Sequence, residues 1–458
     1  MNPEAIYHRP RNEFAYFDEQ GTVTLLLRAA CGDLRGAALC WFDKYVEDQP
    51  HARTEMECFL TDDLFAYYRA QVTPPYRRLQ YYFRLEDAGG EVWYLDEQGT
   101  HRSPEGCTEA CFQMPYLNRG DAIRVPEWAE SAIFYQIFPD SFARREPVPT
   151  GETFPAWGSE PDVVKPLGGN FAGMRDHLDH LSALGINALY LCPIFRSNTC
   201  HRYNTYDYFS IDPRLGTLED FCAFLDDCHS RGIRVVLDAV FNHTCDTFPQ
   251  FRDVMARGRD SEYYNWYFIN RYPFAVDGEY SYERFAFERH MPKLNTEDPD
   301  VRDYLLRVAR YWTEMGIDGW RLDVADELPD DFIAAIRDAI QAEKPNGYLL
   351  GEVWEDGSNK IAYSRRRRYL LGRETHGLMN YPFRTALLAY LSGGDADDFR
   401  EAMETLRENY PPAAFYSAMN FLGTHDTPRI LTLLGQAALC CILTAARLGG
   451  LYAPFSLA

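Results

Sequence analysis

The stretch GWRLDVADE, residues 319–327, has the apolar character of a buried β-strand but carries charged side chains in its middle. Arg321 and Asp323 are two positions apart, so in an extended chain both side chains leave the same face of the strand. Leu322 and Val324 leave the opposite face. Because unpaired buried charges are costly, a charge pair on an apolar strand needs a partner or a function.

Short apolar runs alternate with amphipathic stretches from Ala132 onward, and GWRLDVADE is one of these runs. The amphipathic stretches, such as residues 171–185 and 217–232, carry apolar residues at i, i+3 and i+4 and end at a glycine, which predicts helices. The candidate strands lie at residues 132–139, 186–195, 233–242, 317–325, 347–354, 376–382 and 417–426. Repeated strand–helix units predict a parallel sheet, and seven in succession favour an α/β fold of the (β/α)8-type, a TIM barrel, over a doubly wound sheet.

The first 125 residues have a different rhythm, with short alternating strands separated by turn residues. Residues 79–95 form the clearest hairpin, with large apolar side chains at every second position. We therefore predict an all-β sandwich over residues 1–125 and a barrel over residues 126–458. Because about 55 residues follow the third barrel strand before the next helix, we also predict a small inserted subdomain at residues 244–298.

The composition limits the partners that the chain can bind. A formal net charge of −22 argues against nucleic acid or an anionic membrane, because both would repel the chain. An aromatic content of 15% suits bulky cores and stacking surfaces for sugar rings. The N-terminus lacks the apolar core of a signal peptide and no apolar run reaches about 18 residues, so we expect a soluble cytoplasmic protein. The 12 cysteines include no C-x-x-C pair, which favours reduced thiols.

Polar residues gather where the predicted barrel strands end. They are Asp238, Asn242 and His243 after the third strand, Arg321 and Asp323 on the fourth, Glu352 after the fifth, and His425 and Asp426 after the seventh. Alone, such a carboxylate could cap the next helix and such a histidine could be an ordinary core residue. Acids at four strand ends favour an active site, because barrel enzymes place their catalytic groups there. Paired carboxylates without a phosphate-binding loop or a nicotinamide fingerprint indicate glycoside hydrolysis.

Five ordered segments resemble a known enzyme family. DAVFNHT, GWRLDVADE, GEVWE and FLGTHDTPR resemble, in that order, the four signature regions of the α-amylase family, glycoside hydrolase family 13. MPKLN, Met291–Asn295, is similar to a further signature of its neopullulanase, cyclomaltodextrinase and maltogenic amylase group. The resemblance covers almost the whole chain, because that group carries an N-terminal β-sandwich of carbohydrate-binding type before its barrel.

The resemblance implies a role for each of the strand-end residues. Asp323 would be the nucleophile, Glu352 the general acid/base and Asp426 the carboxylate that stabilises the transition state. The implied substrate-binding residues are Tyr203, Asp238, His243, Arg321, Trp354 and His425. The implied reaction is retaining hydrolysis of α-1,4 bonds, with α-1,6 bonds left open, in cyclodextrins, maltodextrins or pullulan, through a covalent glucosyl-enzyme on Asp323. Transglycosylation on the same substrates and an inactive glucan-binding homologue are the alternatives.

The sequence departs from this family where many members bind calcium. Arg144 and Arg145 stand where oxygen ligands would be needed, and Asn170 stands where an aspartate would be expected. Because calcium takes six or more oxygens, several of them from carboxylates, we predict no calcium there, no other metal site and no cofactor. Within the active site, we expect Arg321 to keep Asp323 ionised.

The remaining expectations concern the end of the chain, one charge run and the oligomeric state. No recognisable eighth strand follows the seventh, so we expect a barrel that is truncated before its eighth strand. Residues 364–372, SRRRRYLLG, are interpreted as a solvated helix face. The resemblance also implies a homodimer.

Overall fold

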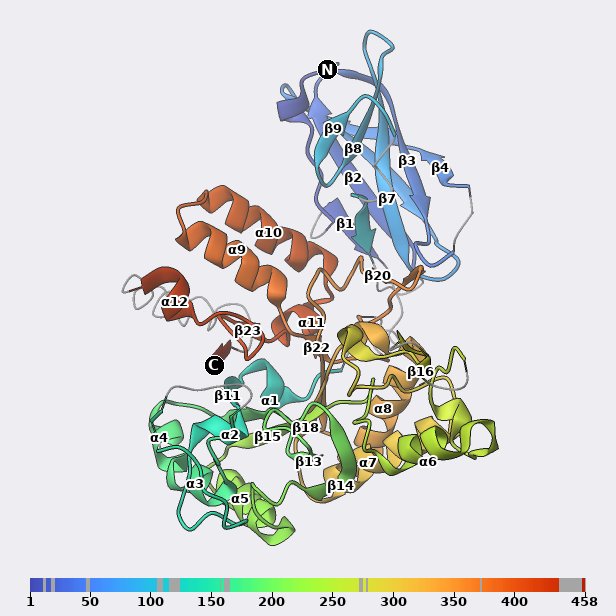
Figure 1. Cartoon of the computed structure of the whole chain (residues 1–458). Helices are drawn as coiled ribbons and strands as arrows, with labels where there is room; N and C mark the ends of the chain where they lie inside the picture. The colour runs from blue at the N-terminus through green and yellow to red at the C-terminus, as the bar shows by residue number, and fades with distance from the viewer. Residues whose placement is uncertain are drawn as a thin grey trace. The chain divides into compact units, whose positions relative to one another are not determined.

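A computed structural model describes most of the chain. It covers residues 1–10, 14–17, 21–46, 50–104, 110–114, 124–156, 158–159, 165–271, 275–276, 279–370, 373–435 and 455–457. The chain divides into two compact units (Figure 1). Unit 1 comprises Met1–Ile123 and Met403–Pro412, and unit 2 comprises Arg124–Ala402 and Ala413–Ala458.

Unit 1 contains a sandwich of two antiparallel sheets, which confirms the predicted all-β fold of this region. One sheet, in the order β1-β2-β6-β5, consists of β1 Ala15–Phe17, β2 Val23–Ala30, β6 Phe65–Val72 and β5 Glu57–Thr61. The other has the order β4-β3-β7-β8-β9, with β10 also paired to β7. Its strands are β3 Leu34–Phe42, β4 Ala52–Glu55, β7 Leu79–Asp87, β8 Val92–Asp96, β9 Gly99–His101 and β10 Phe112–Met114.

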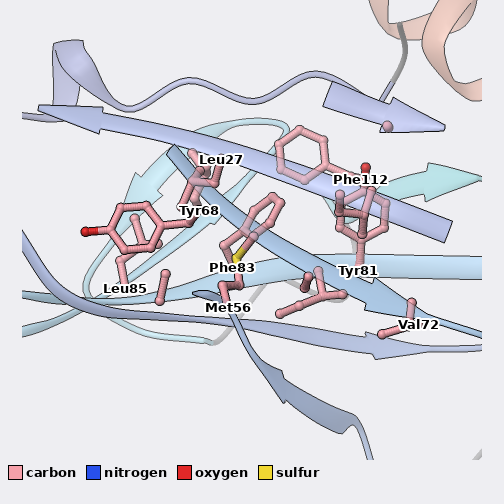
Figure 2. Close-up of a cluster of buried hydrophobic side chains, with 14 of the residues drawn as sticks. Leu27, Met56, Tyr68, Val72, Tyr81, Phe83, Leu85 and Phe112 are labelled. Atoms are coloured by element: carbon pink, nitrogen blue, oxygen red, sulfur yellow. The ribbon is translucent and has the colours of Figure 1, made fainter. Parts of the chain in front are cut away.

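The core of the sandwich follows from the alternation of side chains along β7. Tyr81, Phe83 and Leu85 are two positions apart and fully buried. They lie in one cluster with Leu27 from the facing sheet and Phe112 from β10 (Figure 2). Alternate residues of a strand share a face, so this spacing is the reason that the hairpin can be recognised from sequence.

Unit 2 contains a ring of parallel strands in the order β22-β19-β18-β15-β12-β11-β24-β23. These are β11 Ile133–Ile137, β12 Ala188–Leu191, β15 Arg234–Ala239, β18 Gly319–Leu322, β19 Tyr348–Gly351, β22 Gly377–Leu378, β23 Asn420–Phe421 and β24 Phe455–Leu457. A parallel bridge between Met379 and Met419 joins the two ends of this order and closes the ring. All seven predicted strands are present in the predicted order.

The prediction that the barrel is truncated before its eighth strand is wrong. Strand β24 pairs in parallel with β11 on one side and with β23 on the other. A strand of three residues inserted between two existing strands takes its position from backbone hydrogen bonds. It carries no side-chain periodicity long enough to be recognised in the sequence.

Helices cover the outer side of the ring, as α3, α5, α7 and α8 show in Figure 1. The described helices are α1 Glu127–Glu130, α2 Pro139–Phe142, α3 Phe171–Asp176, α4 Leu178–Ala183, α5 Leu218–Ser230, α6 Pro249–Arg257, α7 Pro299–Glu314, α8 Asp330–Glu343, α9 Tyr381–Leu391, α10 Ala396–Asn409, α11 Pro412–Tyr416 and α12 Ile430–Leu434. Helix α5 begins at a capping box of Thr217 and Asp220, and it buries Phe221, Phe224 and Cys228 on one face. None of the described helices is both long and apolar enough to cross a bilayer.

Among the described residues, three of the irregular segments between the strands and helices of the barrel are relevant to the site or to a prediction. Strands β13 Phe195–Ser197 and β14 Thr205–Ile211 form a hairpin after β12. Residues 244–298, after β15, contain α6, short 3-10 turns and the two-residue strands β16 Ala275–Val276 and β17 Glu279–Tyr280.

The third irregular segment follows β19 and corrects one prediction. Strand β21, Arg365–Arg366, pairs with β20, Ile361–Ala362, so the start of this charge run lies in a hairpin rather than on a helix face. Arg367 is only 5% exposed. Four consecutive arginines give no periodicity, and the carboxylate that binds Arg367 belongs to Asp330, which is distant in the sequence.

Candidate active site

Arg321 of β18 is the centre of the strand-end cluster. Its guanidinium is fully buried, and Nη1 donates to Asp323 Oδ1 at 2.7 Å and to Asp238 Oδ1 at 2.9 Å. Nη2 lies 3.0 Å from Glu352 Oε2. Asp238 is the last residue but one of β15, Asp323 directly follows β18 and Glu352 directly follows β19, so three neighbouring strands place their carboxylates around one cation. The same-face prediction for Arg321 and Asp323 is thereby confirmed, since the two side chains touch.

The charge balance around Arg321 differs from the expectation. Burial raises the pKa of Asp323 well above its ordinary value; Arg321 opposes this shift, and the negative charges of Glu352 and Asp238 add to it. Burial also raises the pKa of Asp238, against the opposing charge of Arg321. The pKa of Asp323 is thus raised rather than lowered despite its contact with Arg321, because one guanidinium is shared among several buried carboxylates.

Tyr203 and His425 form a second network on the other side of Asp238. Gln136 Nε2 donates to His425 Nδ1 at 2.6 Å, so the single proton of the neutral ring lies on Nε2. That proton is donated to Tyr203 Oη at 2.6 Å, and Tyr203 in turn donates to Asp238 Oδ2 at 2.8 Å. Tyr190 donates to the same oxygen at 2.5 Å. Burial lowers the pKa of His425 to about 3, which keeps the ring neutral.

The carboxylate of Glu352 is held by its own neighbours as well as by Arg321. The Trp354 indole donates to Oε1 at 3.1 Å, and the backbone N–H of Val324 donates to Oε2 at 2.8 Å. Trp354 is 48% exposed and stacks on the buried ring of Tyr381, with 4.1 Å between ring centroids. Glu352 therefore contacts an exposed tryptophan whose ring is held in place by stacking on Tyr381.

Asp426 and His243 lie next to these networks, each with a different exposure. Asp426 Oδ2 is 3.2 Å from His425 Nε2, and its side chain is 39% exposed. Burial raises the pKa of Asp426 to about 6, and the charge of Glu352 adds to this shift. His243 is fully buried, with Nε2 3.1 Å from the carbonyl oxygen of Tyr203 and its ring stacked on Phe285. All of the predicted site residues thus belong to one connected region of the barrel.

Sequence reasoning missed several contributors to this region. Gln136 and Tyr190 are polar side chains inside buried strands, which is the same signal that singled out GWRLDVADE. Val324 contributes its backbone N–H from a left-handed conformation, with φ of 41°. A β-branched residue rarely adopts that conformation, so no sequence signal predicts it.

The region where many family members would bind calcium offers donors instead of ligands. Arg144 Nη1 donates to the carbonyl oxygens of Leu167 at 2.8 Å and Pro155 at 3.0 Å. The side-chain oxygen of Asn170 accepts from the backbone of Gly173 at 2.8 Å, where it caps helix α3. These residues do not fit a calcium ion, because a guanidinium binds the available carbonyl oxygens. Among the described residues, no group of three or more His, Cys, Asp or Glu side chains is placed to hold a metal.

Comparison with known proteins agrees with the geometry. Residues 136–448 match the alpha amylase catalytic domain, and residues 1–118 match the alpha amylase N-terminal ig-like domain. The chain is 42% identical to a cyclomaltodextrinase of a Bacillus species over 434 residues, which cover 94% of this chain and 76% of that protein.

Two further comparisons give the same result. A neopullulanase 2 of Thermoactinomyces vulgaris is 37% identical over 440 residues, covering 94% of this chain and 73% of the relative. A solved cyclomaltodextrinase structure superposes with a TM-score of 0.72 at 40% identity, over 100% of this chain and 78% of the other. The chain therefore belongs to the α-amylase family, in the group of the cyclomaltodextrinases and neopullulanases.

Proposed function

We propose that the protein is a retaining α-glucan hydrolase in which Asp323 is the nucleophile, Glu352 the general acid/base and Asp426 the stabilising carboxylate. The observation that carries the proposal is the shared guanidinium of Arg321, which contacts both Asp323 and Glu352. Contact with one guanidinium brings the two carboxyl groups near each other, and retaining glycosidases hold the nucleophile and the acid roughly 5–5.5 Å apart.

In the first step, a carboxylate oxygen of Asp323 attacks the anomeric carbon while the bond from that carbon to the glycosidic oxygen breaks. Glu352 transfers its proton to the departing oxygen and becomes a carboxylate. The products are a free sugar chain and a glucosyl ester on Asp323. The Val324 N–H and the Trp354 indole hold the Glu352 carboxyl group in position for this transfer.

In the second step, a water molecule attacks the anomeric carbon and Glu352 removes one of its protons. The ester bond to Asp323 breaks, which restores the carboxylate of the nucleophile and the proton on Glu352. Two inversions at the same carbon give a product with the original α configuration. A second sugar in place of water gives transglycosylation, so both reactions use the same intermediate.

The excess of carboxylates over cations suits the charge that develops during the reaction. The guanidinium of Arg321 is surrounded by three carboxylates, those of Asp238, Asp323 and Glu352. Burial makes it unfavourable for all three carboxylates to be ionised at once. An oxocarbenium-like transition state brings positive charge next to Asp323 and so favours its ionised form. Stabilisation that is realised only in the transition state raises the catalytic rate.

The substrates that we propose are cyclodextrins, maltodextrins or pullulan, with α-1,4 bonds cleaved and α-1,6 bonds as a second candidate. The names of the relatives, cyclomaltodextrinase and neopullulanase, support this class. An inactive glucan-binding homologue is less well supported, because all three proposed catalytic carboxylates are present and the eighth strand closes the barrel. A homodimer and a cytoplasmic location stay predictions.

The test is product analysis with purified protein on β-cyclodextrin, maltohexaose and pullulan. We expect linear maltodextrins from the cyclic substrate, and proton NMR at early times should show the α anomer. Asp323→Asn is the control for contaminating activity. A folded, monodisperse sample that releases no sugar would overturn the proposal, and an initial β anomer would overturn the retaining mechanism.

A further inference from the structure

The hairpin of β20 and β21 ends in a turn with an unusual backbone. Ile361 pairs with Arg366 and Ala362 with Arg365, so the turn consists of Tyr363 and Ser364. Both turn residues have positive φ, 52° and 61°. Two-residue hairpins with this geometry normally contain glycine or asparagine. A tyrosine there is strained, and such strain persists only where surrounding contacts hold the residue.

The contacts of Tyr363 hold its hydroxyl, and Lys293 Nζ lies 4.8 Å from the centroid of its ring. The hydroxyl donates to Glu327 Oε2, and it accepts from Lys293 Nζ at 3.0 Å. Lys293 also forms an ion pair with Glu327. The side chain of Tyr363 is nevertheless 67% exposed. An aromatic ring that is fixed at its tip and open to solvent is preorganised to stack against a flat apolar face.

Tyr363 lies where three strand-end segments of the barrel meet. Its hairpin follows β19, and Glu327 is four residues after Asp323 on the segment that follows β18. Lys293 forms a backbone bridge with His243, which follows β15. The turn is therefore attached to the same segments that carry the proposed nucleophile and a proposed sugar-binding histidine.

The base of the hairpin is anchored through Arg367. Its guanidinium donates to the carbonyl oxygens of Asp326, at 2.6 Å, and of Leu328, and to Asp330 Oδ1 at 2.8 Å. Lys360 adds an ion pair with Asp326 at 3.0 Å. Fixed at its base and at its tip, the hairpin holds the Tyr363 ring in one place.

We propose that Tyr363 binds substrate and determines specificity, by stacking on a glucose ring of the part of the glucan that departs. The proposal rests on the proposed function. The hairpin belongs to the segment after Glu352, the proposed donor of the proton to the departing oxygen, and this placement favours the leaving side of the scissile bond. Trp354, 48% exposed on the same segment, provides a neighbouring apolar surface next to Glu352 itself.

The experiment compares a substrate that has sugars on the leaving side with one that has none. Maltohexaose has several, whereas α-maltosyl fluoride loses only fluoride. For Tyr363→Ala we expect kcat/KM on maltohexaose to fall roughly fivefold to tenfold, because one aromatic stacking contact is lost, and kcat/KM on the fluoride to stay unchanged. Tyr363→Phe keeps the ring and should lose less than Tyr363→Ala. With excess maltose as acceptor, Tyr363→Ala should also show a smaller transferred fraction.

Ile361→Ala is the matched control, because Ile361 is 59% exposed on the same hairpin and carries no ring. This variant should leave kcat/KM unchanged on both substrates. Equal losses on both substrates in Tyr363→Ala would show a merely structural hairpin and overturn the inference. No loss on either substrate would overturn it as well.

A binding measurement separates this inference from the proposed reaction. In an Asp323→Asn background, Tyr363→Ala should weaken maltohexaose binding by a similar factor in calorimetry. If the wild-type protein releases no sugar from either substrate, the proposed function fails, and the binding experiment still decides whether Tyr363 contacts the glucan. An unchanged affinity would overturn the role of Tyr363 alone.

Discussion

Strand β18 has a buried aspartate at each end, and the two carboxylates have opposite surroundings. Asp318, which precedes the strand, is 1% exposed and accepts from His229 at 2.8 Å, Arg234 at 3.0 Å and Lys344 at 2.8 Å. Burial alone would raise its pKa, but hydrogen bonds from His229 and Lys344 outweigh burial and lower the pKa of Asp318 to about 2.

Asp323, at the other end, is 7% exposed and shares the guanidinium of Arg321 with Asp238 and Glu352. Here burial wins and raises the pKa of Asp323. At Asp318 several hydrogen-bond donors outweigh burial, whereas at Asp323 one shared guanidinium does not. We therefore expect the Asp318 end to stabilise the barrel, and the Asp323 end, with more carboxylates than cations, to cost stability in return for the proposed chemistry.

The largest expected effect is that of Asp323→Asn, which removes the proposed nucleophile. Turnover of maltohexaose should fall by roughly 10⁴-fold or more, as the loss of a catalytic nucleophile does in other hydrolases. The same change should raise the melting temperature at pH 7. A carboxyl group with a raised folded pKa adds stability only at low pH and loses it as the pH rises through that pKa.

The stability gain of Asp323→Asn should therefore shrink as the pH falls toward about 4, because the aspartate of the unfolded protein also begins to bind a proton there. Thermal scans of both proteins between pH 4 and 8 measure this trend. A lower melting temperature for the variant at pH 7 would contradict the contrast between the two ends of β18.

The second prediction concerns Asp318→Asn, which should destabilise the barrel by about 3 kcal/mol, as expected when one partner of a buried ion pair is removed. The loss of unfolding free energy should be complete at neutral pH and disappear as the pH falls through 3.8 toward 2, because the pKa of Asp318 is lowered in the folded protein. Urea unfolding measures it. Asp179→Asn is the control: its 86% exposed side chain pairs with Arg231, so its removal should change the unfolding free energy by less than about 1 kcal/mol.

The same contrast explains which features the sequence could predict. GWRLDVADE, the strand order and the helix faces depend on periodicity, so they could be recognised before any coordinates. Asp318 carries equally strong interactions, but its partners His229, Arg234 and Lys344 come from three distant places in the sequence. A buried carboxylate whose partners are distant in the sequence cannot be recognised from the residues next to it.

The charge state of the site could not be predicted for a related reason. Arg321 and Asp323 are neighbours in sequence, so their pairing was predictable. Asp238 and Glu352 reach the same guanidinium from other strands, and their charges together with burial reverse the expected direction of the pKa shift. The eighth strand escaped prediction because backbone pairing alone defines it.

The third prediction uses the pKa of Asp426, which burial raises to about 6. If its ionised form stabilises the transition state, kcat/KM should fall as the pH drops through about 6, by roughly tenfold per unit below it. His425 cannot produce this limb, because its pKa is about 3 and its ring stays neutral. Initial rates between pH 4 and 8 measure the profile.

Two variants distinguish Asp426 from its neighbour His425 as the source of this acid limb. Asp426→Asn should have much lower activity and a flatter profile near pH 6. His425→Gln should be less active but keep the limb in place. A wild-type limb centred near pH 4 would be inconsistent with the proposed role of Asp426.

The smallest expected effect is that of a chelator. Because Arg144 occupies carbonyl oxygens that a calcium ion would need, excess EDTA should shift the melting temperature by less than about 1 °C and leave activity unchanged. Arg144→Ala removes two hydrogen bonds and should lower the melting temperature by roughly 2–4 °C. A large EDTA effect that calcium reverses would show that oxygen ligands outside the Arg144 region hold a metal. A bound ion stabilises only the folded chain, so EDTA should lower the melting temperature if an ion is bound. An unchanged melting temperature in EDTA, together with a lower one in Arg144→Ala, would show that the guanidinium of Arg144 holds these loop carbonyl groups together without a metal.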